Sequence, residues 1–144
     1  MVIYLKIINE LLKISDNSRY YAKRMKDFLI NESDIYYEDA TIIKMQKTVI
    51  KSLNYLYKCI SNTNCDVDNT YVKVLSEDSK IDDLYSVLEK NILNKVVHDR
   101  DISMEYVNII GTLHKFERIS ERCVEIANLL CFAKDGKASE IYKS

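Results

Sequence analysis

The scarcity of chain-turning residues constrains the fold of this sequence more than any other feature. Its 144 residues include no proline and only two glycines. β-Sheets need frequent turns, and turns depend on Gly and Pro. The length suits one domain, and a content of 47% hydrophobic residues is enough to fill a core. The composition therefore predicts an all-α domain of long helices joined by short polar loops.

Charge and cysteine content narrow the class of protein. The 21 basic and 22 acidic residues nearly cancel, which excludes the one-sided basic field of a nucleic-acid binder. No apolar run reaches the ~18 residues that span a bilayer, and the N-terminus does not resemble a signal peptide. The cysteines at positions 59, 65, 123 and 131 match no standard zinc-site spacing. We therefore expect reduced thiols and a cytoplasmic location, with any membrane association made through a partner.

Apolar residues recur at steps of three and four along four segments, which predicts helices at residues 2–30, 35–60, 67–98 and 102–134. Connections this short make neighbouring helices antiparallel, so the sequence predicts an elongated up-down bundle. The predicted inward-facing positions, helix by helix, are Ile7, Leu11, Ile14, Ser18, Tyr21, Met25 and Phe28; Ile42, Met45, Val49, Leu53, Leu56 and Ile60; Val74, Ile81, Leu84, Leu88 and Ile92; and Ile109, Leu113, Phe116, Ile119, Cys123, Ile126 and Leu130.

A stripe of carboxylates runs along the fourth predicted helix. At 100° per residue, Glu117, Glu121 and Glu125 fall opposite the apolar seam. His114 and Asn128 lie beside them. Two glutamates four residues apart can hold one hard or borderline cation from the same helix, so this face is a candidate metal site.

The third predicted helix carries a second pair, Asp78 and Asp82, which are also four residues apart. Glu77 and Asp83 add negative charge nearby. If the third and fourth helices are antiparallel neighbours, the two pairs can face each other. Four carboxylates then supply ligands for one or more metal ions without any cysteine.

The alternative interpretation is that the stripe is a solvated helix face. An acidic stripe opposite an apolar seam is typical of any surface helix. Lys115, Arg118 and Arg122 are close enough in sequence to neutralise it as ordinary surface ion pairs.

Catalytic motifs are not evident in the sequence. A di-iron oxidase bundle uses Glu-x-x-His on two helices, but Lys95 and Gly111 stand three residues before His98 and His114. Neither glycine forms part of a Gly-rich phosphate loop, and two histidines give poor support to a nucleophilic triad. We therefore expect no catalytic residues and a protein that works by binding.

The first and last predicted helices share a weak internal repeat. Residues 11–22, LLKISDNSRYYA, can be aligned with residues 116–127, FERISERCVEIA, through the Ile-Ser pair, the acidic residue that follows it and the final Ala. The two helices are therefore interpreted as equivalent elements of two repeats.

Three stretches resemble the PhoU family of phosphate-transport regulators. Residues 109–127, IIGTLHKFERISERCVEIA, are similar to the family's last-helix signature, L-E-R-I-G-D-H-A-x-N-I-A. Residues 77–85, EDSKIDDLY, resemble its D-x-x-x-D-x-L-Y helix, and residues 7–16 resemble the end of its first repeat. The resemblance implies two three-helix repeats, with residues 1–30 as the last helix of a truncated first repeat and residues 34–136 as a complete second one, in a single domain spanning residues 1–144.

The resemblance also implies a multinuclear iron or zinc cluster held by carboxylates. The corresponding positions here are Asp78, Asp82, Glu117, Glu121 and Asp16. The sequence departs from the family at Ser120-Glu121-Arg122, where the signature has Gly-Asp-His, and at Leu12, where it has Glu.

The function implied by the resemblance is regulatory. Proteins of this family restrain phosphate uptake through an ABC phosphate transporter and its sensor kinase, on the cytoplasmic side of the bacterial membrane. Alternatives are the cytoplasmic tail of a sodium/phosphate cotransporter, a metal-dependent enzyme using the carboxylate faces, or a helical adaptor or homodimerisation module without metal.

Overall fold

The computed structural model describes residues 2–30, 39–98 and 103–135, and every element in these ranges is a helix. The four helices are α1 (Val2–Ile30), α2 (Asp39–Ser61), α3 (Val67–His98) and α4 (Ser103–Asp135). The predicted all-α class and the predicted bounds at residues 2, 30, 67 and 98 are confirmed, and the other ends differ by one residue where they can be compared. The starts predicted at residues 35 and 102 lie outside the described residues.

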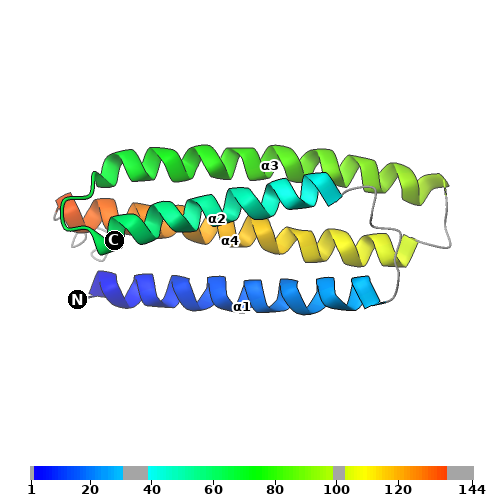
Figure 1. The fold of residues 1–144 in the computed structure, drawn as a ribbon, viewed down its shortest axis with the longest axis horizontal. Helices are drawn as coiled ribbons and strands as arrows, with labels where there is room; N and C mark the ends of the chain where they lie inside the picture. Colours follow the sequence, from blue (N-terminus) through cyan, green and yellow to red (C-terminus); the bar gives the residue numbers. More distant parts are fainter. Residues whose placement is uncertain (1, 31–38, 99–102, 136–144) are drawn as a thin grey trace, which may run out of the picture.

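The helices form an elongated antiparallel bundle in which α4 is the central element (Figure 1). Helix α4 packs against α1, α2 and α3, whereas α1 packs mainly against α4. Each helix runs opposite to the one before it, as short connections require. This arrangement gives α4 two polar borders, one shared with α1 and one shared with α3. None of the described helices combines the length and apolar composition needed to cross a bilayer.

The core follows the predicted apolar seams. Its most enclosed side chains include Met45, Val74, Ile81 and Leu113, each with no exposed surface. Tyr21 links three helices, because its ring lies 4.1 Å from that of Phe116 and its hydroxyl accepts a 2.7 Å hydrogen bond from Gln46 Nε2. Burial of this ring raises the pKa of the Tyr21 hydroxyl above its ordinary value, so the hydroxyl stays protonated at neutral pH.

Three positions predicted to face inward are exposed: Leu11, Ser18 and Ile60. In α1 the neighbouring Glu10 is buried instead of Leu11, because an arginine on α4 pairs with its carboxylate. Spacing from Ile7 and Ile14 is compatible with either residue 10 or residue 11 facing the bundle, so the ion pair decides the side. Phe28, also predicted to face inward, has a side chain outside the described set.

The expectation of four reduced cysteines is wrong for two of them. Cys59, in the last turn of α2, forms a disulfide with Cys65, just before α3. The turn between these helices reverses the chain and brings the two Cα atoms to 5.0 Å, a distance that a disulfide spans. Asp66 caps α3 at this point, since its Oδ1 accepts a 3.1 Å hydrogen bond from the Asn69 amide. Cys123 and Cys131 carry free thiols.

Candidate functional site

The two predicted carboxylate pairs lie together on the border between α3 and α4. The pKa of Asp82 is raised, first by partial burial and then by the charges of Asp78 and Glu121. The pKa of Glu117 is also raised, again mainly by burial, with the charges of Asp82 and Glu121 adding to the effect and His114 opposing it. Such mutual repulsion requires the four carboxylates to be near neighbours. The structure therefore places the pair Asp78 and Asp82 beside the pair Glu117 and Glu121, as predicted.

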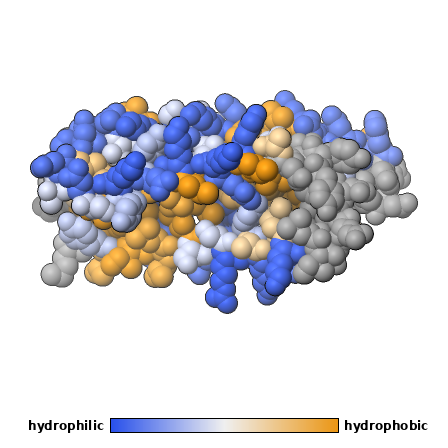
Figure 2. Space-filling model, viewed as in Figure 1, coloured by the Kyte–Doolittle hydropathy of each residue, from blue (hydrophilic) through white to orange (hydrophobic). Residues whose placement is uncertain are grey.

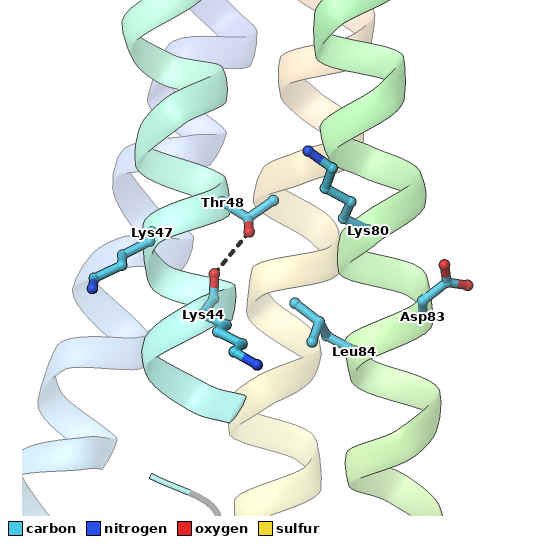
Figure 3. A pocket seen from close by; sticks show the side chains of 6 residues that line it. All are labelled: Lys44, Lys47, Thr48, Lys80, Asp83 and Leu84. Carbon is cyan, nitrogen blue, oxygen red and sulfur yellow. Dashed lines mark hydrogen bonds between the residues drawn. The ribbon is translucent and has the colours of Figure 1, made fainter. Parts of the chain in front are cut away.

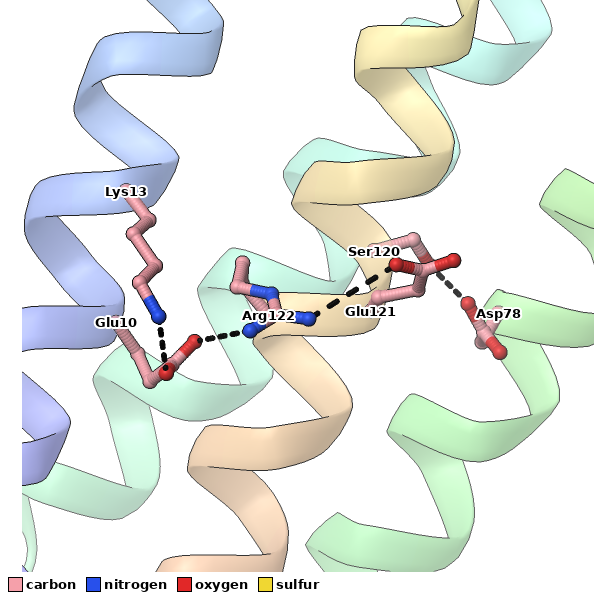
Figure 4. A network of polar contacts seen from close by, with 6 residues as sticks. All are labelled: Glu10, Lys13, Asp78, Ser120, Glu121 and Arg122. Carbon is pink, nitrogen blue, oxygen red and sulfur yellow. Dashed lines mark hydrogen bonds and ion pairs between the residues drawn. The ribbon is translucent and has the colours of Figure 1, made fainter.

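Two of the residues that depart from the family signature, Ser120 and Arg122, act as partners of these carboxylates (Figure 4). Ser120, which is 1% exposed, donates a 2.7 Å hydrogen bond from its hydroxyl to Asp78 Oδ1. Arg122 Nη2 lies 3.9 Å from Glu121 Oε2. A hydroxyl donor therefore occupies Asp78 on α3, whereas Glu121 on α4 has only a longer ion pair with Arg122.

Arg122 has a second and closer partner that sequence reasoning missed. Its Nη1 lies 3.2 Å from Oε2 of Glu10 on α1, and Lys13 Nζ lies 3.3 Å from the other Glu10 oxygen. Glu10 is only 8% exposed, and buried carboxylates are rare unless they are paired. The signal in the sequence was an acidic residue at the edge of the α1 seam, between Ile7 and Ile14.

The structure differs from the sequence analysis in the exposure of Glu117 and in the position of Asp16. Glu117 does not lie on a solvated helix face, which is the alternative interpretation of the stripe: its side chain is 18% exposed, while that of Glu121 is 54% exposed. The reason is that α4 packs against three helices and has no single solvent-exposed face. Asp16 is exposed on α1, and α1 lies across α4 from α3 (Figure 1). The structure does not bring Asp16 to Asp78 and Asp82.

Carboxylate oxygens are suitable ligands for hard cations, but this cluster is not a preformed metal site. Across the described ranges, no three His, Cys, Asp or Glu side chains are placed to hold one ion. Asp78 and Glu121 also face donors from Ser120 and Arg122. The Cys123 thiol is protonated at neutral pH, because burial and the charge of Asp78 raise its pKa to about 12. Binding of iron or zinc stays a prediction from the resemblance.

Comparison with known proteins gives one match. The PhoU domain family matches residues 42–130, which extend from the first turns of α2 through most of α4 and make up more than half of the chain. No curated protein and no solved structure matches the chain significantly. The match leaves α1 outside it and includes all four clustered carboxylates. The chain belongs to the PhoU domain family.

Proposed function

We propose that this protein regulates inorganic phosphate transport by binding a transporter subunit or its sensor kinase on the cytoplasmic side of the membrane. Membership of the PhoU family is the observation that carries the proposal. Binding would shift the partner between its conformational states, which requires different contacts with each state. The proposed work is binding, not catalysis.

An exposed apolar face on α1 supports a binding role. We define the apolar face of α1 as Tyr4, Leu5, Ile8, Leu11 and Leu12, which are 67%, 62%, 52%, 43% and 60% exposed. Apolar side chains gather over this half of α1 and part of α2 at the lower left of Figure 2. Clustered apolar side chains of this size on a protein surface mark an interaction site.

The apolar face suits a protein partner because it lies on the outer side of α1, opposite the packed side that contains Ile7 and Ile14. A partner can cover it without disturbing the bundle core. Removal of several exposed leucine, isoleucine and tyrosine side chains from water is a favourable term of the size that sustains protein association.

The test is recovery of phosphate-transport components from native membranes by the tagged full chain. The Leu5→Glu/Leu12→Glu variant should lose at least tenfold in recovery of the transporter or the kinase. Val87→Glu is the matched control, since Val87 is 53% exposed on α3, away from the apolar face of α1. Undiminished recovery by the double variant would reject this face as the binding surface.

The same samples separate a protein partner from a second copy of the chain. Light scattering after size exclusion should give the same mass for the wild type and for Leu5→Glu/Leu12→Glu. A dimer that dissociates only in the double variant, with no transport component recovered by either protein, would replace the proposal with a homodimerisation module.

A further inference from the structure

A groove on the opposite border of α3 has the character of an anion site. It lies between α2 and α3, is largely open to solvent, has a volume of about 420 Å³ and is lined by Lys44, Lys47, Thr48, Lys80, Asp83 and Leu84. We call it the lysine groove. Its volume falls in the range of small-molecule sites, roughly 300–1,000 Å³. It shares no lining residue with the carboxylate cluster.

The positive charge of the lysine groove originates in α2. Residues 40–61 contain Lys44, Lys47, Lys51 and Lys58 and no acidic residue, in a chain whose total charge is −1. The spacing of three, four and seven residues places the four lysines on one side of the helix. Helix α2 therefore presents a basic stripe beside α3.

Among the described residues, two of these cations have no acidic partner. Lys51 and Lys80 lie 3.5 and 3.0 Å from Glu77 Oε1, and Glu77 is buried with 4% exposure. Lys44 and Lys47 form no ion pair with any side chain that the structure describes. Asp83, the acidic residue of the lining, points away from the groove in Figure 3.

The floor of the groove is apolar. Thr48 donates its hydroxyl to the Lys44 carbonyl over 2.7 Å, which turns its methyl group toward α3 (Figure 3). Leu84 projects from α3 into the same gap, and the ammonium groups of Lys44 and Lys80 lie on either side (Figure 3). A ligand that matches this lining has a charged end and an apolar body.

We propose that the lysine groove binds a small organic phosphate, a phosphate monoester with an apolar or aromatic substituent. The phosphate dianion would lie between Lys44 and Lys80, whereas the ammonium group of Lys47 points away from α3 in Figure 3. Of the two flanking lysines, Lys44 has no acidic partner among the described residues and Lys80 shares its charge with Glu77, and lysine binds phosphate as a point charge. The substituent would cover Leu84 and the Thr48 methyl group. The site does not depend on the proposed partner and stands if that partner is wrong.

Nuclear magnetic resonance titration of the full chain tests the proposal, with phenyl phosphate as the probe at fixed ionic strength. Inorganic phosphate and phenol are the two half-probes, which carry the charge alone and the ring alone. Phenyl phosphate should bind at least fivefold more tightly than either half-probe. Its amide shifts should centre on residues 44–48 and 80–84.

Two variants locate the binding. Lys44→Ala should weaken phenyl phosphate at least fivefold. Lys58→Ala removes the same charge from the same stripe outside the groove and should leave the affinity within twofold of the wild type. Equal loss in both variants, or equal affinity for phenyl phosphate and inorganic phosphate, would mean diffuse attraction to a basic helix and would overturn the proposal. Spectra of the two ligand-free variants that match the wild-type spectrum establish that both variants are folded.

Discussion

Two consecutive carboxylates of α3 lie on opposite borders of the helix and have neighbours of opposite charge. Glu77, on the border with α2, is 4% exposed and has two lysines within 3.5 Å. Asp78, the next residue, is on the border with α4, beside Asp82 and two glutamates. One border has surplus positive charge, and the other has surplus negative charge. The charges on the facing helix, α2 or α4, decide what each acidic residue can do.

This difference separates a structural role from a binding role. A carboxylate that is already paired with lysines contributes to the fold and offers little to a ligand. Carboxylates that repel one another favour a proton or an added cation. The α2 border is therefore suited to an anion and the α4 border to a cation, and the following variants test whether this contrast holds.

The largest effect is expected from removal of the cations that face Glu77. The double variant Lys51→Ala/Lys80→Ala should lower the free energy of unfolding more than the other variants do, because a buried carboxylate is left without a cation. The loss should be smaller than for a fully buried pair, since both lysine side chains are 54% exposed. Denaturant unfolding measures it. The control variant Lys58→Ala/Lys90→Ala removes two charges from the same helices. An equal loss of unfolding free energy in the control would contradict a structural role for the Glu77 ion pairs.

A smaller effect is expected on the α4 border, where Ser120 supplies the internal donor to Asp78. Ser120→Ala should cost about 1 kcal/mol of unfolding free energy, the usual value for one hydrogen bond. The exposed Ser76 on α3 is the matched control, and Ser76→Ala should change stability very little. In an Asp78→Ala background the cost of Ser120→Ala should disappear. A cost that persists there would assign the effect to packing.

Much of the fold could be predicted from the sequence, because the helical period alone identifies most buried positions. Ile81, Leu88 and Ile92 are buried as their spacing indicates. The meeting of Asp78 and Asp82 with Glu117 and Glu121 followed from antiparallel α3 and α4. These inferences needed only the helical period and short connections.

The remaining features depend on contacts between distant parts of the chain. Glu10 and Arg122 are 112 residues apart, and their ion pair accompanies the burial of Glu10 in place of Leu11. Glu77 and Asp78 are equivalent in any local pattern, and only the positions of α2 and α4 distinguish them. The Cys59–Cys65 disulfide depends on the tightness of the turn after α2. Residue spacing does not contain this information.

The smallest expected effect is the most informative about the cluster, and it comes from Asp82→Asn. The pKa of Asp82 is raised in the folded protein, so the folded state binds more protons than the unfolded state just above the unfolded pKa of about 4. Wild-type stability therefore falls as pH rises through that window, and the penalty is complete at neutral pH. Without metal, Asp82→Asn should be more stable than the wild type at pH 7 by about 0.3 kcal/mol, because solvent screens this exposed group.

The sign of that difference separates an empty acidic cluster from a metal centre. The gain should vanish below about pH 4, where the aspartate is protonated in both states. If the cluster holds iron or zinc, Asp82→Asn should instead be less stable than the wild type at pH 7, because binding to the folded state adds stability that the variant loses. Elemental analysis of protein purified without chelators should then give less metal in the variant. Asp83→Asn removes the same charge from the neighbouring residue, whose charge contributes least to the raised pKa of Asp82, and an equal response there would assign the effect to net charge.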